Sequence, residues 1–164
     1  MNTFDLALDI LATTPIQLRS IITALPPGVL VVQPSPDAWS VEQVLRHLLQ
    51  VENAVIAERI RRMVREENPT FTSGPSVSVP SEPAAILNAW LAAREDSLAM
   101  LRALTPAQLA RSGQHPRYGP ITVREHVVEW AYHDLDHLRQ ILAALQSVLY
   151  PEIGAFQTLY SKPS

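Results

Sequence analysis

Residues 122–149 read TVREHVVEWAYHDLDHLRQILAALQSVL, and this stretch predicts one long helix from Val123 to about Leu149. The helix start is marked by Thr122 and Glu125, which have the spacing of a capping box, in which each side chain bonds the backbone of the other residue. Apolar and histidine side chains then recur at three- and four-residue steps, which places them on one helix face. That face comprises Val123, His126, Val127, Trp130, His133, His137, Ile141, Ala144 and Leu145. Because the face is largely apolar, other helices must cover it.

Three further segments show helical spacing of apolar residues, and connections rich in proline separate them. We expect helices over residues 4–24, 40–67 and 82–104. Pro15 is expected to kink or break the first of them, and a capping box of Ser40 and Gln43 opens the second. The chain has 164 residues, 47% of them hydrophobic and 18% charged, which is enough to bury one continuous core. The sequence therefore predicts an all-α protein, a four-helix bundle that forms a single domain over residues 1–164.

The connections between the predicted helices differ in length. Residues 68–83 are rich in Pro, Ser, Thr and Gly and predict a long crossover between helices 2 and 3. Within it, residues 77–79 (Val-Ser-Val) have the composition of a short strand. The second long connection begins with a short helical turn over residues 105–109 and contains His115. We expect residues 151–164 to cover one end of the bundle.

Composition excludes several classes of function. The net charge of −3 and the pI near 5.9 predict no binding to nucleic acid, although Arg59, Arg61, Arg62 and Arg65 form a local basic cluster. The chain has no cysteine, so a tight metal site must consist of histidine and carboxylate. We find neither a secretory signal nor the ~20 uninterrupted apolar residues of a membrane span. We therefore expect a cytoplasmic protein that binds no membrane.

Histidine spacing indicates a metal site. His133 and His137 are four residues apart on the predicted helix, so their imidazoles lie on one face, and His47 supplies a third imidazole from the apolar face of the second helix. Three neutral imidazoles leave one coordination position of a divalent metal open for water. The alternative is that a backbone carbonyl or a nearby carboxylate, such as Asp134, satisfies each histidine separately.

Other histidine and carboxylate residues lie near the predicted site. His126 and His115 are each a fourth ligand, a proton donor or an ordinary polar residue, and the ordinary interpretation is favoured. Asp134 and Asp136 flank the histidines but point to other sides of the helix, where solvent or Arg139 contacts them.

We expect Trp39 and Trp130 to be core aromatics. Gln140 either caps the inner end of the site or is an ordinary polar residue. Glu52, His126 and Tyr132 are polar residues that could face the cavity, and the sequence does not say which of them does so. Glu52 follows His47 by five residues, which is too far around a helix for us to assume a general base.

Three segments carry a resemblance to a known family. They are residues 39–48 (WSVEQVLRHL), 119–126 (GPITVREH) and 133–140 (HDLDHLRQ). In their order and separation the chain resembles the DinB-like superfamily of metal-binding four-helix bundles, which includes the YfiT-like metal-dependent hydrolases. The resemblance implies His47, His133 and His137 as the ligands and a homodimer as the assembly. It does not imply one reaction, because related bundles include transferases and isomerases that use low-molecular-weight thiols.

The first of three functional hypotheses is a metal-dependent enzyme, because an open three-ligand site is typical of catalysis. Zinc or nickel would activate water in a hydrolase, or a low-molecular-weight thiol in a transferase, for attack on a small-molecule substrate. The second is a non-catalytic protein that binds metal or a small molecule, for example in a stress response. The third is an interaction module in which the arginine-rich face or the crossover contacts a partner.

Overall fold

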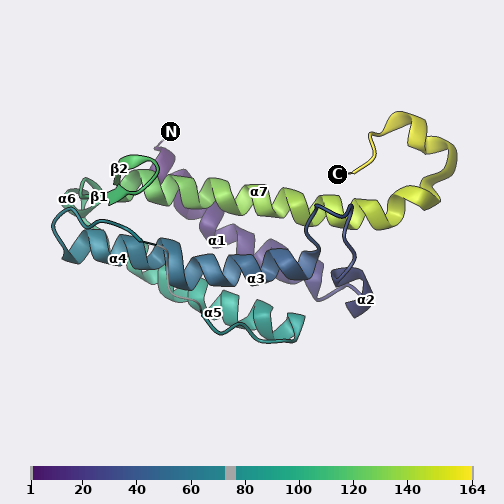
Figure 1. Cartoon of the computed structure of the whole chain (residues 1–164), viewed down its shortest axis with the longest axis horizontal. Helices are drawn as coiled ribbons and strands as arrows, with labels where there is room; N and C mark the ends of the chain where they lie inside the picture. Colours follow the sequence, from purple (N-terminus) through teal and green to yellow (C-terminus); the bar gives the residue numbers. More distant parts are fainter. Residues whose placement is uncertain (1, 73–76, 164) are drawn as a thin grey trace.

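Four long helical segments form the bundle in the computed structural model, which describes residues 2–72 and 77–163 (Figure 1). They are α1 (Thr3–Ile22), α3 (Val41–Val51) continued by the π-helical turn η1 (Glu52–Ile56) and α4 (Ala57–Arg65), α5 (Pro83–Arg102), and α7 (Val123–Leu149). Helix α1 packs against α7 and α5, and α3 packs against α5 and α7. This arrangement confirms the predicted all-α four-helix bundle with a long crossover between its second and third helices.

Local sequence signals set the helix starts. At α7 the Glu125 amide donates to the Thr122 hydroxyl at 3.1 Å, and the Thr122 amide donates to the Glu125 carboxylate at 2.8 Å. The capping box predicted at Ser40 and Gln43 is likewise complete and opens α3. Pro15, in contrast, does not break α1, which continues unbroken to Ile22. None of the described helices has both the length and the apolar composition that a membrane span needs.

The core has two hydrophobic clusters at different heights along the bundle. One packs around Trp130 and the other around Trp90. Along the helices, the boundary between the clusters falls at buried polar residues, with Thr14 on α1, Glu52 at the start of η1, Arg94 on α5 and Asp134 on α7. A polar layer therefore divides the core at mid-height.

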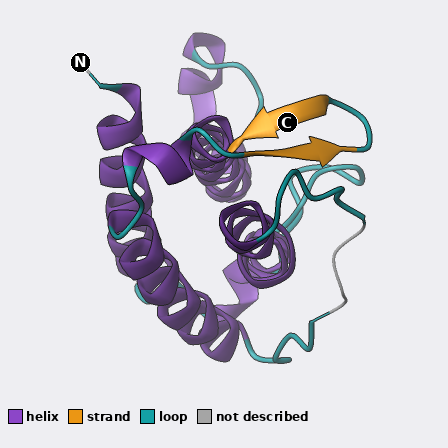
Figure 2. Ribbon diagram, turned by 90° about the vertical axis from the view of Figure 1, so that its left-hand side faces the viewer, coloured by secondary structure: helices purple, strands orange, loops and turns teal. Residues whose placement is uncertain are grey.

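The short elements lie near the two ends of the bundle. They are α2 (Pro27–Leu30), α6 (Pro106–Leu109), and an antiparallel hairpin of β1 (Ser112–His115) and β2 (Gly119–Thr122) at the end where α7 begins (Figures 1 and 2). The strand predicted at residues 77–79 is wrong, since these residues have no regular structure. Pro69 and Phe71 instead occupy the edge of β1, through backbone hydrogen bonds with Gln114 of 2.8 and 2.9 Å.

The segment after α7, η2 (Tyr150–Leu159), consists of 3₁₀-helical turns with a kink at Gly154, whose backbone is not helical. We expected it to cover one end of the bundle, but it turns back beside the end of α7 (Figure 1). Phe156 and Leu159 of this segment, and Tyr160 directly after it, are therefore exposed.

Candidate metal centre

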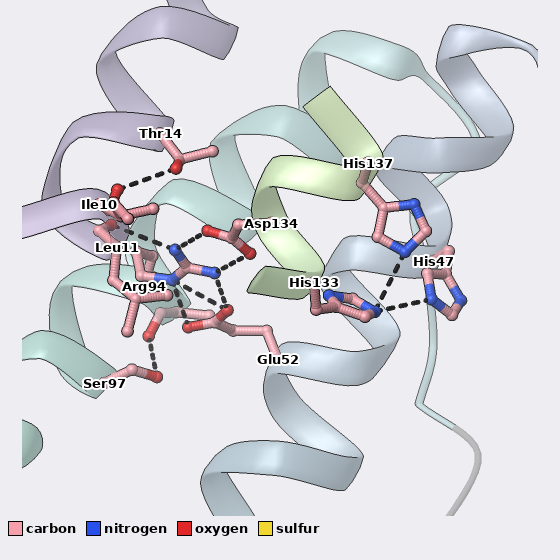
Figure 3. A network of polar contacts seen from close by, with 11 residues as sticks. Ile10, Leu11, Thr14, His47, Glu52, Arg94, Ser97, His133, Asp134 and His137 are labelled. Atoms are coloured by element: carbon pink, nitrogen blue, oxygen red, sulfur yellow. Dashed lines mark hydrogen bonds and ion pairs between the residues drawn. The ribbon is translucent and has the colours of Figure 1, made fainter. Parts of the chain in front are cut away.

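Three imidazole rings converge between α3 and α7. The Nε2 atom of His133 lies 3.2 Å from Nε2 of His47 and 3.1 Å from Nε2 of His137 (Figure 3). Their candidate ligand atoms all lie within 4.8 Å of one another. Nitrogen ligands at 2.0–2.1 Å from a tetrahedral ion are about 3.3 Å apart, so the spacing suits one divalent metal ion. The structure thus brings together the three histidines that the sequence singled out.

The protonation of these rings favours a cation between them. Burial, together with the neighbouring His137, lowers the pKa of His47 to about 4, and burial with both neighbours does the same for the pKa of His133. Both rings are therefore neutral at pH 7. A neutral ring can donate a hydrogen to a neighbouring Nε2 at 3.1–3.2 Å, and an Nε2 atom that keeps its lone pair can bind a cation. The donor set therefore fits a metal ion.

Gln140 orients one of the three rings. Its Oε1 atom lies 2.9 Å from Nδ1 of His137. Because an amide oxygen only accepts, Nδ1 carries the hydrogen and Nε2 keeps its lone pair toward the cluster. This contact agrees with the predicted role of Gln140 at the site.

The carboxylates that could have satisfied the histidines separately bind elsewhere. Asp136 pairs with Arg139 at 3.0 Å, as expected. Asp134 contradicts the prediction of solvent or Arg139 contact, because it is 1% exposed and pairs with Arg94 of α5. The part of α7 that carries Asp134 therefore faces the interior of the bundle, where the Arg94 side chain reaches it from α5.

Arg94 joins the two helices that carry the histidines. Its guanidinium donates to both oxygens of Glu52 at 2.7–3.0 Å and to both oxygens of Asp134, and all three residues are 1% exposed (Figure 3). Burial alone would lower the pKa of Arg94, but the two carboxylates raise it. Since Asp134 directly follows His133, the network fixes the α7 backbone beside the imidazole cluster.

Arg94 also explains why α1 tolerates its proline. Pro15 has no amide hydrogen, so the carbonyl of Leu11 loses its normal helical donor four residues later. Arg94 replaces that donor with an Nη1 hydrogen bond of 3.1 Å to the Leu11 oxygen. One buried side chain thus satisfies the free carbonyl on α1 and two carboxylates from the helices that carry the histidines.

Sequence reasoning missed Arg94, although a signal was present. Arg94 lies at helical spacing from Trp90 and Leu98 within the apolar stripe of its helix, where a charged residue needs a buried partner.

Glu52 does not face the imidazole cluster, because Arg94 engages both of its oxygens. The π-helical turn that begins at Glu52 had no recognisable sequence signal.

One aromatic prediction near the site is wrong. Trp39, expected in the core, is 41% exposed and stacks on His137 with ring centroids 5.9 Å apart and planes 4° apart. Ser40 caps α3, so Trp39 precedes the helix. The Trp39 ring lies over the imidazoles. Tyr132, considered for the cavity, is 75% exposed and points away from the core. Trp130 is buried, as predicted.

The remaining histidines lie outside the cluster. Nδ1 of His115 accepts hydrogen bonds from the backbone amides of Arg117 and Tyr118 at 3.1 and 3.2 Å. His126 is buried, with Nδ1 at 3.4 Å from the Glu129 carboxylate. Neither residue joins the group of possible metal ligands. A cavity of about 260 Å³ opens beside the cluster, with Trp39, His137 and Gln140 in its lining.

The fold and this site define a class, a four-helix bundle with a three-histidine cluster between two of its helices that is suited to a divalent metal. The family model of the DinB superfamily matches residues 10–141. The chain therefore belongs to the DinB superfamily.

Two solved structures show the same fold. YfiT from Bacillus subtilis, described as a probable metal-dependent hydrolase with an unusual four-helix bundle topology, has a TM-score of 0.77 at 21% identity, over 88% of this chain and 87% of YfiT. TT2238, a four-helix bundle protein, has a TM-score of 0.61 at 24% identity, over 85% of this chain and 98% of TT2238. No curated protein matches the sequence.

Proposed function

We propose that this protein is a metal-dependent enzyme that holds one divalent ion, zinc or nickel, with His47, His133 and His137. The observation that carries the proposal is the convergence of three Nε2 atoms from two helices, with no fourth histidine or carboxylate in the group among the described residues. An ion bound by three imidazoles supplies an open position at which a water or a thiol loses its proton near neutral pH.

Neighbouring side chains would prepare the site for a small-molecule substrate. Gln140 holds the His137 ring, and Trp39 keeps water away from one side of the imidazoles. The cavity of about 260 Å³ beside them has room for a small organic molecule or for part of a low-molecular-weight thiol. These features support two reactions, hydrolysis with water as the nucleophile and transfer with a thiol as the nucleophile.

We also propose that the protein is a homodimer. Tyr132, Leu135, Leu142 and Leu149 are exposed large side chains at three- and seven-residue steps along α7, so they form one outer stripe. The expected assembly of DinB-like bundles agrees with a second copy on this face. Sedimentation of the wild type should give a dimer and that of the double variant Leu135→Glu/Leu142→Glu a monomer; a monomeric wild type would refute the assembly.

Elemental analysis of untagged protein tests the metal site. The wild type should contain about one equivalent of metal after incubation with zinc or nickel, and His47→Ala and His137→Ala should each lose it. His115→Ala is the matched control and should keep the metal, because His115 lies outside the cluster. Wild type without metal would refute the proposal.

Activity is measured next, with ester and amide hydrolysis and thiol transfer to electrophiles as the two screens. Activity in either screen that is lost in His47→Ala would support the proposal that the protein is an enzyme. Metal binding without a rate in either screen would instead assign the non-catalytic binding role.

A further inference from the structure

The imidazole cluster is divided between two helices, so its geometry depends on the separation of α3 and α7. His47 comes from α3, and His133 and His137 come from α7. The Nε2 atoms of His47 and His133 lie 3.2 Å apart across the two helices. The ligands of a metal site must be held within about 0.5 Å of their productive positions. A shift of α3 relative to α7 by about 1 Å would therefore separate one imidazole from the shared ion.

A buried polar link joins these two helices through α5. Arg94 of α5 pairs with Glu52, where α3 passes into η1, and with Asp134 of α7. We call these three residues the Arg94 network. Every other ion pair among residues 2–72 and 77–163 lies within one helix or at its end. In the described part of the chain, the two pairs of Arg94 are thus the ion pairs that connect different helices.

The Arg94 guanidinium uses all five of its N–H hydrogens. Those on Nε and one on Nη2 go to Glu52, the second on Nη2 and one on Nη1 go to Asp134, and the last goes to the Leu11 carbonyl. The guanidinium carbon also lies 4.9 Å and 5.2 Å from the centroids of two buried tryptophan rings, one on α5 and one on α7. Both the plane and the position of this fork are therefore fixed.

Each carboxylate of the network lies close in sequence to a candidate ligand. Asp134 directly follows His133 on α7. Glu52 follows His47 by five residues, at the point where α3 passes into the π-helical turn. Both oxygens of each carboxylate accept from Arg94, and such bidentate pairs fix orientation as well as distance. The network therefore holds α3 and α7 relative to each other, beside the two imidazoles that must meet.

From these contacts we propose that Arg94 is a positioning residue of the metal site, which holds α3 and α7 at the separation where His47 and His133 can bind one ion. The proposal rests on the proposed function, because it requires that the cluster binds a metal. Arg94 is not a ligand and acts through the two helices. Loss of its fork should weaken metal binding by moving the ligands, even where the protein stays folded. Because the charge of Arg94 also lowers the pKa of His133, the test variant must keep that charge.

Cobalt(II) titration of the metal-free protein is the test, because this ion accepts imidazole ligands and its visible absorption reports their geometry. Arg94→Lys keeps the charge but replaces the fork with a single ammonium, which cannot hold both carboxylates in bidentate pairs. We expect Arg94→Lys to bind cobalt at least about tenfold more weakly than the wild type, with shifted absorption bands. Affinity and bands equal to those of the wild type would overturn the proposal.

Two further variants separate positioning from stability. In Gly113→Ala the added Cβ would overlap the Phe71 ring beside the hairpin, so this control should lose stability but keep the cobalt affinity and bands of the wild type. Weaker cobalt binding there would show that affinity follows stability and would overturn the proposal. The triple variant Glu52→Met/Arg94→Met/Asp134→Leu has an apolar layer, which should recover stability but not cobalt affinity, because apolar packing is not directional. Cobalt binding by the triple variant at the affinity of the wild type would assign Arg94 a purely structural role and overturn the proposal.

The wild type separates this proposal from the metal site itself. If the wild type binds about one equivalent of cobalt, the metal site is supported and the variants decide the positioning role alone. A wild type that binds no cobalt refutes the metal site and the positioning role with it. Circular dichroism verifies that each variant is folded under the conditions of the titration, and if Arg94→Lys is unfolded the triple variant decides.

Discussion

Replacing Arg94 with methionine tests whether the buried network holds the bundle together. Methionine keeps most of the side-chain volume but removes the charge and every donor. Glu52 and Asp134 would remain buried without a cation, and the Leu11 carbonyl would have no donor, because Pro15 cannot supply one.

The magnitude follows from these contacts. Breaking a buried ion pair costs about 3–5 kcal/mol, and an unsatisfied buried carbonyl costs about 1–3 kcal/mol. The two carboxyls recover part of this by taking up protons, and burial already raises the pKa of Glu52. We therefore expect Arg94→Met to lower the free energy of unfolding by about 4 kcal/mol, a large share of the 5–15 kcal/mol typical of a domain.

Urea denaturation at pH 7, followed by circular dichroism, measures this change. The matched control is Arg139→Met, which breaks an exposed ion pair with Asp136 on α7 and should cost less than about 1 kcal/mol. The triple variant Glu52→Met/Arg94→Met/Asp134→Leu should regain at least half of the loss, because an apolar layer replaces the charges together. A loss below about 1 kcal/mol for Arg94→Met would refute the reasoning, since the network would then contribute no more than a surface pair.

Further predictions concern the ligands, pH and the hairpin. Gln140→Leu removes the acceptor that fixes one imidazole and should weaken zinc binding about 10- to 100-fold in a competition titration; unchanged affinity would show that the ring needs no such support. Because the pKa values of His47 and His133 fall from 6.5 to about 4 in the metal-free fold, the unfolded chain binds more protons between these values. Stability of chelator-treated protein should therefore fall as the pH drops from 6.5 to 4, and a melting temperature that stays constant there argues against the lowered values. Gly113→Ala should cost about 1–3 kcal/mol, because its Cβ would overlap a buried aromatic ring, whereas Gly28→Ala meets no atom within 4 Å and serves as control; equal effects of the two would contradict the packing.

Much of the fold was predictable because its signals are local. The capping boxes at Ser40 and Thr122 specify where α3 and α7 begin, and both are complete in the structure. The hairpin was not predictable from pattern. Its strands have four residues each, with Gly113 and Pro120 among them, and show no clear alternation of apolar and polar residues. It pairs beside residues 69–71, which lie far away in sequence.

The candidate site also has one part that the sequence predicts and one part that it does not. His133 and His137 face one direction because of helical geometry, so their proximity follows from a four-residue spacing alone. Trp39 was wrongly expected in the core, because its exposure depends on how the loop before α3 contacts α7. No local sequence pattern specifies that contact.

By itself the sequence determined the helices, their apolar faces, the paired histidines on α7 and membership of the DinB superfamily. Only the tertiary structure decided which charged residues lie inside. Arg94, Glu52 and Asp134 come from three helices, and although Arg94 stands out as a charged residue in an apolar stripe, its own segment does not show which residues pair with it. Packing brings them within hydrogen-bond distance of one another, where pairing offsets the cost of burying each charge. Pairing across 40 and 42 residues depends on how the helices are oriented, which helical periodicity within one segment does not encode.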